Sequence, residues 1–262
     1  MAGFRQKISE LLSFRQLLFN LVSIELKLRY RKHVLGFLWT VLNPLFYLII
    51  LAVVFSKIMK FQVPHYTLFL LSGLTSWLML QQTVVIATGS IVNNQGLIKK
   101  VYIPRLVFPL SNVMARFVDH VVLTVILLVF MIAFRRPLTW ALLFVPVSIL
   151  LHFFFTLGLS LLSSVAYIKV RDVQHILSIV FQALFYLTPI IYPLDVLPPH
   201  YRSLFLLNPF YYFVETLRAP VYQSVLPAPD VILTAAGLTV LALAAGLFLF
   251  LRKEKEFVFH LS

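Results

Sequence analysis

Long apolar stretches constrain this chain more than any other feature. Residues 138–168 run for 31 positions without a charged side chain, and residues 66–92 also carry none. About 20 apolar residues in a helix are enough to cross the roughly 30 Å hydrocarbon core of a bilayer. Charged residues make up only 12% of the chain, whereas soluble domains have about 25%. The sequence therefore predicts an all-α polytopic membrane protein.

Six stretches are long enough to serve as transmembrane helices, and the whole chain, 1–262, is expected to form one transmembrane domain. The predicted spans are residues 35–55, 66–92, 107–134, 138–168, 173–194 and 231–251. Asn43-Pro44 is expected to kink the first span, and Pro189 and Pro193 the fifth, because proline removes a helical hydrogen bond. Six spans place both termini on the same side.

The distribution of basic residues predicts which side that is. Of 22 Lys and Arg, 15 fall on the termini and the connections that share their side, 6 fall on the opposite side, and Arg116 lies within a span. Because basic residues accumulate in cytoplasmic loops, residues 1–34 and the tail 252–262 are expected to be cytoplasmic. The formal charge of +13 is explained by this orientation, and nucleic acid is not an expected partner.

The segment before the first span is expected to form an amphipathic helix at the membrane surface. From Phe14 to Arg31, apolar residues recur at helical spacing, while Glu25, Arg29 and Lys32 lie on another face. Such a helix either only anchors the first span or also contacts a cytoplasmic partner.

A short basic connection, residues 93–106, interrupts the apolar sequence between the second and third spans. Asn93, Asn94 and Gly96 are expected to end one helix, and Pro104 favours the start of the next, which leaves a short amphipathic helix across the gap. This helix is predicted to be the contact site for a soluble partner. The predicted contact residues are Leu97, Ile98, Lys99, Lys100, Val101, Tyr102, Ile103 and Arg105.

The long connection on the outer side, residues 195–230, is rich in aromatic residues and prolines rather than in charged ones. It is expected to form one or two short helices that re-enter the outer leaflet, where other spans or water satisfy the broken backbone. The residues predicted to gate an exit there are Asn208, Pro209, Phe210, Tyr211, Tyr212, Glu215 and Arg218.

Catalytic motifs are missing from the sequence. No glycine stands in the context of a phosphate-binding GxxxxGK[ST] loop, no HExxH spacing predicts a metal site, and no serine lies in a nucleophile elbow. Asp119 is the sole acidic residue within a predicted span. Its spacing from Arg116 predicts an ion pair on one helix face, with a proton relay as the alternative. The chain is thus not expected to be an enzyme or to bind a metal or cofactor, and any ATP use requires a separate protein.

Aromatic residues, 25 Phe, 11 Tyr and 3 Trp, are numerous enough to do more than anchor spans. Any one of them is explained by lipid contact or helix packing. Together, some are expected to line a passage on which sugar rings stack, namely Tyr47, Trp77, Phe181, Phe185, Tyr186 and Tyr192, with Tyr211 and Tyr212 at its outer end.

Four blocks in order carry a resemblance to a known family. They are ELKLRYRKHVLGFLWTVLNPL from Glu25, LIKKVYIPRLVFPLS from Leu97, VRDVQHILSIVFQALFYLTPIIYP from Val170 and NPFYYFVETLRAPV from Asn208. The chain resembles the permease subunit of type-2 ABC exporters and is most similar to the Wzm and TagG type, which export lipid-linked O antigens and teichoic acids.

The resemblance implies a homodimer in the bacterial cytoplasmic membrane, bound to two ATPase subunits that hold ATP and magnesium. It also implies an undecaprenyl-linked glycan as the substrate, a coupling helix at residues 97–103 and outer gate helices near residues 208–222. Three alternatives remain: an ABC exporter of a small lipid or drug, an ion-coupled carrier, and a membrane-embedded transferase.

Overall fold

The computed structural model describes residues 9–30 and 34–257, and it is helical throughout this part of the chain, with no strand. The prediction of an all-α membrane protein is confirmed. Five of its helical segments are long and apolar enough to cross a membrane. The predicted cytoplasmic segments also include residues 1–8, 31–33 and 258–262, which lie outside the described residues.

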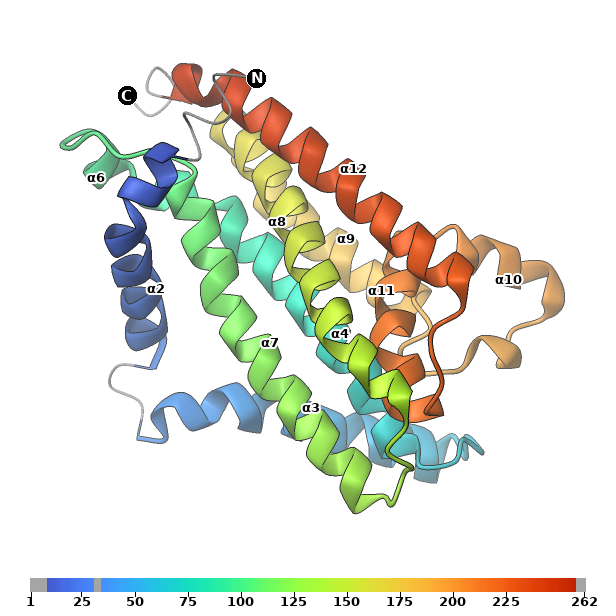
Figure 1. Ribbon diagram of the computed structural model, residues 1–262. Helices are drawn as coiled ribbons and strands as arrows, with labels where there is room; N and C mark the ends of the chain where they lie inside the picture. The colour runs from blue at the N-terminus through green and yellow to red at the C-terminus, as the bar shows by residue number, and fades with distance from the viewer. Residues whose placement is uncertain (1–8, 31–33, 258–262) are drawn as a thin grey trace.

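The helices follow one another through short connections (Figure 1). The main helices are α2 (Arg15–Tyr30), α3 (Trp39–Val53), α4 (Tyr66–Thr88), α7 (Val107–Ala133), α8 (Val145–Lys169), α9 (Val173–Leu187) and α12 (Pro229–Lys253). Short helices lie between them: α5 (Ser90–Asn93), α6 (Gln95–Ile98), α10 (Pro199–Leu206) and α11 (Pro209–Arg218). Further turns of 3-10 or π helix are Gly36–Leu38, Val54–Ile58, Trp140–Phe144, Leu194–Val196, Ala219–Gln223 and Glu254–Glu256.

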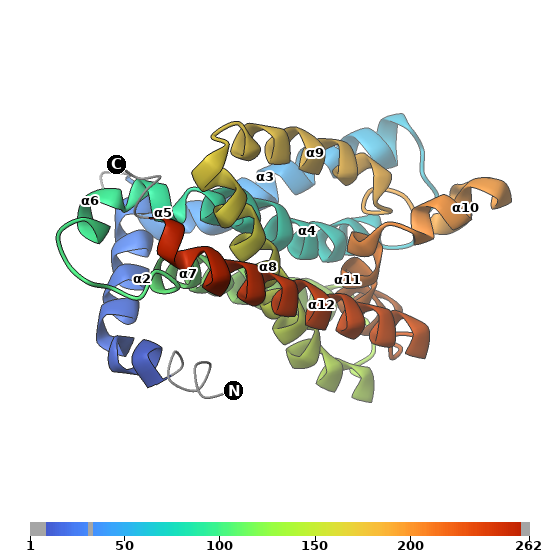
Figure 2. The same cartoon turned by 90° about the horizontal axis from the view of Figure 1, so that it is seen from above.

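Helix α4 lies at the centre of the bundle, and 17 of its 23 residues are buried. Small and hydroxyl side chains such as Ser72, Gly73 and Ser76 let neighbouring helices approach it closely, as is usual between membrane helices. Several of its buried hydroxyl groups donate to carbonyl oxygens of the helix's own backbone; Thr75, for example, donates to Leu71 at 2.8 Å. Thr83 donates instead to the sulfur of Met79. In Figure 2, α3 and α9 lie on one side of α4, and α8 and α12 on the other.

The fifth predicted span is shorter in the structure than the sequence indicated. Residues 173–194 were expected to cross the membrane, but α9 ends at Leu187 after 15 residues, which at about 1.5 Å per residue falls short of a bilayer core. Pro189 explains the difference, because a residue before proline is driven out of the helical region. Thr188 is accordingly extended, with φ −106° and ψ 135°.

Helix α2 packs along the first half of α7. Leu18 of α2 lies in one apolar cluster with Ile103, Val107 and Phe108, which fastens the start of α2 to the start of α7. The two helices stay in contact as far as Arg29, which bonds Asp119. The amphipathic segment therefore forms part of the helical bundle.

Candidate functional site

An open groove lies on the side of the bundle formed by α3, α4 and α9. Its volume is about 450 Å³, within the range of sites that hold organic ligands. The lining is mixed, with aromatic, amide and hydroxyl groups: Tyr47, Trp77, Leu78, Gln81, Ser178, Gln182, Phe185 and Tyr186.

Four of the six aromatic residues predicted to line a passage are part of this groove: Tyr47, Trp77, Phe185 and Tyr186. The other two lie elsewhere. Phe181 is 2% exposed and packs behind Trp77, with ring centroids 5.9 Å apart. Tyr192 follows the end of α9 and donates its hydroxyl proton to the carbonyl oxygen of Tyr186.

Three polar residues of the groove, Gln81, Ser178 and Gln182, were not among the predicted site residues. Ser178, Gln182 and Tyr186 are spaced by four in the sequence, so they share one face of α9. On α4, Gln81 lies one turn after Trp77 and accepts a 2.8 Å hydrogen bond from its indole. The sequence did contain a signal for them, because polar side chains repeat on one face of the apolar helix α9. Polar residues within a membrane segment usually face the interior of the bundle or a water-filled cavity.

The C-terminal end of α9 is closed by side chains rather than by further helix. A broken backbone at membrane depth is tolerated only where its polar groups find partners. Asn208 donates to the carbonyl oxygen of Leu187 at 3.1 Å and to the Thr188 hydroxyl at 2.8 Å, while its own oxygen caps α11 by accepting from the backbone of Phe210. Tyr66 donates to Ile191 at 2.8 Å.

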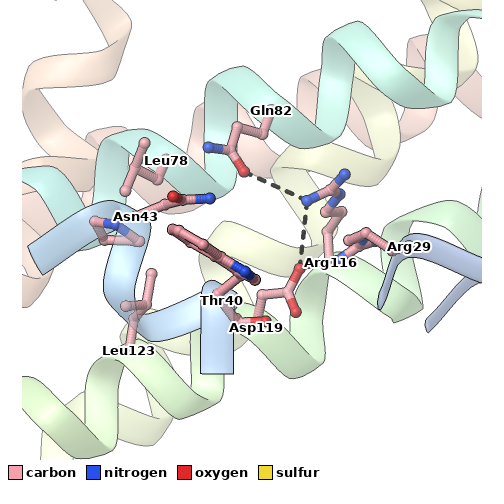
Figure 3. A pocket seen from close by; sticks show the side chains of 10 residues that line it. Arg29, Thr40, Asn43, Leu78, Gln82, Arg116, Asp119 and Leu123 are labelled. Carbon is pink, nitrogen blue, oxygen red and sulfur yellow. Dashed lines mark hydrogen bonds and ion pairs between the residues drawn. The ribbon is translucent and has the colours of Figure 1, made fainter. Parts of the chain in front are cut away.

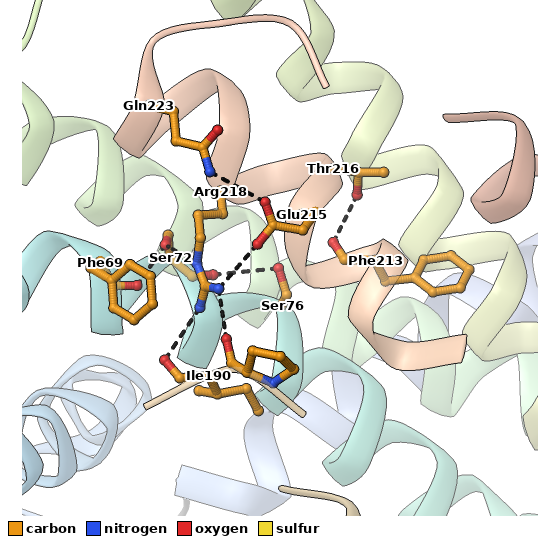
Figure 4. A network of polar contacts seen from close by, with 10 residues as sticks. Phe69, Ser72, Ser76, Ile190, Phe213, Glu215, Thr216, Arg218 and Gln223 are labelled. Carbon is orange, nitrogen blue, oxygen red and sulfur yellow. Dashed lines mark hydrogen bonds and ion pairs between the residues drawn. The ribbon is translucent and has the colours of Figure 1, made fainter. Parts of the chain in front are cut away.

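Arg218 completes this closure (Figure 4). Its guanidinium is 2% exposed, donates to the carbonyl oxygens of Pro189 at 2.6 Å and Ile190 at 3.2 Å, and pairs with Glu215 at 3.1 Å. It also lies 4.0 Å above the ring of Phe69. Folding buries Arg218 between α4, α11 and the end of α9.

Gly73 makes room for this guanidinium. A Cβ on Gly73 would lie 2.5 Å from a terminal nitrogen of Arg218, which is closer than atoms approach without one of them moving. Among the other predicted gate residues, Tyr211 and Tyr212 form an edge-to-face ring pair with centroids 5.3 Å apart. The predicted gate region is therefore tied to the central helix through Arg218.

The basic inner connection differs in detail from its predicted form. The short helix was expected at residues 97–103, but α6 covers only Gln95–Ile98. A turn follows at Lys99 and Lys100, and residues 102–104 have no regular structure, as expected just before and at Pro104. Leu97 and Ile98 face the bundle. The next four residues, Lys99, Lys100, Val101 and Tyr102, are exposed.

Both ends of the described chain hold this connection in place. Tyr102 donates to the Glu10 carboxylate at 2.6 Å, and Arg105 donates to the backbone oxygen of Glu254 at 2.7 Å. As Figure 1 shows, α6 consequently lies at the same end of the bundle as the start of α2 and the end of α12. The four exposed residues thus project from a fixed base.

A second cavity, on the other side of α3, contains charged groups within the apolar helices (Figure 3). Arg116 lies 3.4 Å from the Asp119 carboxylate and 3.4 Å from the Gln82 amide oxygen. Arg29 of α2 bonds the same carboxylate oxygen of Asp119. The predicted pair is therefore a triad in the structure, and sequence spacing gave no signal for Arg29, which lies 90 residues from Asp119.

Among the described residues, no group of three metal-ligating side chains is present. His120 of α7 and His152 of α8 lie side by side, with ring centroids 5.2 Å apart. The arrangement as a whole offers an open aromatic groove, an end of α9 that is closed by side chains and a basic segment that is held by both ends of the described chain. Such an arrangement suits a transport protein.

Comparison with known proteins agrees with this class. The ABC-2 type transporter family model matches residues 16–222, and the chain belongs to that family. It is 32% identical over 252 residues to the O-antigen export system permease protein RfbA of Myxococcus xanthus, covering 95% of this chain and 97% of that protein. A Klebsiella pneumoniae RfbA is 31% identical over 234 residues, covering 86% and 90%.

A further relative is named for another polysaccharide. The polysialic acid transport protein KpsM of Escherichia coli is 28% identical over 247 residues, covering 88% of this chain and 91% of that protein. The two groups of relatives are named for different polysaccharides. The chain itself is a multi-pass membrane protein of the ABC-2 family.

Proposed function

We propose that this chain is the transmembrane permease of an ATP-driven exporter of polysaccharide. The carrying observation is the groove of α3, α4 and α9, which offers aromatic faces and amide groups on the flank of a single copy. Aromatic rings bind sugar rings through their faces without fixing one hydrogen-bond pattern, which suits a polymer that must slide. The relatives named for O-antigen and polysialic acid transport support the same cargo class.

The groove is open because one copy supplies only half of a passage. Large apolar side chains beside it are exposed, among them Ile49 and Ile50 of α3 and Ile179 of α9, at 55%, 60% and 67%. We infer that a second copy packs against this face, so that two grooves enclose one channel in a homodimer. The chain contains no cysteine, so single cysteines test this directly. Ile179→Cys should give a crosslinked dimer, whereas Leu233→Cys, 72% exposed on α12, should not.

The energy must come from another protein under this proposal. The exposed residues Lys99, Lys100, Val101 and Tyr102 form the surface on which a separate ATPase subunit, carrying ATP and magnesium, would act. Both termini and this surface would then face the cytoplasm, and the membrane would be the bacterial inner membrane. The outer region around α10 and α11 would close the far end of the channel, and the cargo would be a glycan attached to a polyprenyl lipid.

Deletion of the chain in its host tests the function. Polymer should accumulate in the cytoplasm and return to the surface when the chain is restored together with an active ATPase. Normal surface polymer with loss of drug or lipid export would replace the proposal by the small-molecule alternative. Uphill transport by the chain alone in liposomes would contradict ATP coupling altogether.

An ion-coupled carrier makes a different prediction at Asp119. In the structure two guanidinium groups hold this carboxylate, which favours a fixed charge over a proton relay. Asp119→Asn should therefore reduce transport and partner ATPase activity together through loss of structure. Loss of transport with full ATPase stimulation would favour ion coupling.

A further inference from the structure

The cavity beside the Arg29, Asp119 and Arg116 triad has both a polar and an apolar wall, which suits a ligand with a polar and an apolar part. It has a volume of about 410 Å³ and lies between α2, α3, α4 and α7. Its polar lining consists of Arg29, Thr40, Asn43, Gln82, Arg116 and Asp119, and its apolar lining of Trp39, Pro44, Leu78 and Leu123. Figure 3 shows polar groups from all four helices directed toward one space.

The guanidinium groups of the lining are suited to an anion. Two arginines and one aspartate are the charged residues of the cavity wall. Glu25, which is outside the wall, lies 3.9 Å from Arg29, so the case for an anion rests on the two guanidinium groups and not on net charge. A guanidinium is the side chain best matched to a phosphate, because its planar fork donates two parallel hydrogen bonds. Asp119 holds both guanidinium groups through one carboxylate oxygen, which fixes their positions at the cavity wall.

The surroundings of the cavity are those of a site reached from lipid. Leu28, Leu38 and Val118 each stand next in sequence to a lining residue, and they are 57%, 49% and 37% exposed. Arg116 lies nine residues into α7, about 13 Å along the helix from its first residue. Charges within a membrane segment are costly and mark functional positions.

If the triad served only to hold the helices together, the cavity beside it would have no explanation. Fastening α2 to α7 needs one cation for the Asp119 carboxylate, and a buried ion pair is most favourable when tightly packed side chains exclude water. Here a second arginine reaches the same carboxylate oxygen, and a cavity of ligand size remains beside them.

We propose that this cavity binds the phosphate or diphosphate head of a membrane lipid. Arg29 and Arg116 contact the phosphate oxygens, the Asn43 and Gln82 amides contact its remaining polar atoms, and the first part of the lipid chain lies against Trp39, Pro44 and Leu123. Phospholipids and polyprenyl phosphates share this head chemistry, and binding measurements distinguish them.

The cavity is separated from the groove by little more than one side chain. Leu78 lines both spaces, so a lipid head bound at the triad lies beside the passage. If the lipid carries the glycan, the cavity holds the anchor while the sugars occupy the groove, and this step rests on the proposed export function.

Binding to the purified full chain in a phosphate-free maltoside detergent tests the site without any transport. Farnesyl diphosphate is expected to bind, and farnesol, with the same chain and no charge, is expected to bind at least about tenfold more weakly. Dihexanoyl phosphatidylglycerol is the phospholipid arm. If either farnesyl diphosphate or the phosphatidylglycerol binds more tightly, that preference identifies the class of lipid that supplies the phosphate. Binding of inorganic diphosphate measures the affinity for the head group without a lipid chain.

Variants separate the site from general charge and folding effects. Arg116→Gln should weaken farnesyl diphosphate binding about tenfold or more, as expected for a lost charge-assisted bond. Arg116→Lys, which keeps the charge without the fork, should give an intermediate loss. The matched control is Arg171→Gln, an exposed position between α8 and α9, which should bind within about twofold of the unmodified chain.

Leu123→Trp keeps all three charges and fills the cavity, so it too should weaken binding, and thermal unfolding shows whether each variant is folded. The proposal is overturned if neither anionic lipid binds, if farnesol binds as well as farnesyl diphosphate, or if folded Arg116→Gln and Leu123→Trp bind normally. Equal binding of inorganic diphosphate would overturn the lipid part. Since no export is measured, failure here leaves the export function standing.

Discussion

Gly158 of α8 and Gly246 of α12 meet where these two helices cross, and a Cβ on Gly246 would lie 2.5 Å from the carbonyl oxygen of Gly158. A Cβ on Gly158 would in turn lie 2.4 Å from the backbone of Ala242. Contacts between small residues are a main source of stability between membrane helices, because apolar association is weak inside lipid. The close packing of α8 on α12 therefore depends on two positions without side chains.

Gly246→Ala should destabilise the protein by about 1–3 kcal/mol, since the added methyl group overpacks a backbone contact that cannot move aside. The matched control is Gly237→Ala on the same helix, where a Cβ would meet nothing within 4 Å. Thermal unfolding in detergent should show a lower midpoint for Gly246→Ala alone. Equal midpoints for the two variants would contradict the close crossing.

Arg218→Gln should destabilise the outer end of the bundle strongly, by about 3–5 kcal/mol, as expected when one member of a buried ion pair is removed. The change leaves Glu215 without its cation and removes the donors to Pro189 and Ile190. Hydrogen exchange of residues 188–191 measures the loss. Arg202→Gln, in the more exposed helix α10, is the control and should leave this exchange unchanged.

Charge reversal at Lys99 and Lys100 together should uncouple partner ATP hydrolysis from export. Both side chains project from the inner connection, and neither takes part in the contacts to Glu10 and Glu254 that hold it. The variant should therefore fold normally, and the proposed dimer should still form. Paired measurements of ATPase rate and surface polymer test this, and unchanged export would remove the connection from the mechanism.

A cysteine at Ser178 should react with a water-soluble maleimide, because this position lines the open groove. A cysteine at Ser160 on α8, which is fully buried, should stay unlabelled in the folded protein. The chain has no cysteine of its own, so each variant reports one position. Equal labelling at both positions would show that the groove is not a distinct water-accessible surface.

Much of the fold was predictable from the sequence because a bilayer restricts what a chain can do. A helix that crosses it needs a minimum number of apolar residues, so α7 begins at Val107 and α8 ends at Lys169, each within one residue of its apolar run. Prolines and basic residues marked the connections between the spans, because their effects on the backbone and on membrane insertion also act within a few residues. The end of α9 was mistaken because Pro189 and Pro193 were both read as kinks within a span, whereas the helix already ends before Pro189.

The candidate site depended on contacts between distant segments. Gln81 and Gln82 are neighbours in sequence, yet Gln81 lines the groove and Gln82 lines the charged cavity, because successive helical residues point about 100° apart. No local pattern in the sequence predicts which of the two glutamines lines which cavity, or that Arg29 contacts Asp119.

The sequence alone determined the apolar helices, their order and their connections, since membrane length and backbone chemistry act within each segment. Only the tertiary structure decided where the few polar side chains go. Inside a membrane such groups must find partners, and Arg218 and Asp119 find theirs on helices that are far away in the chain.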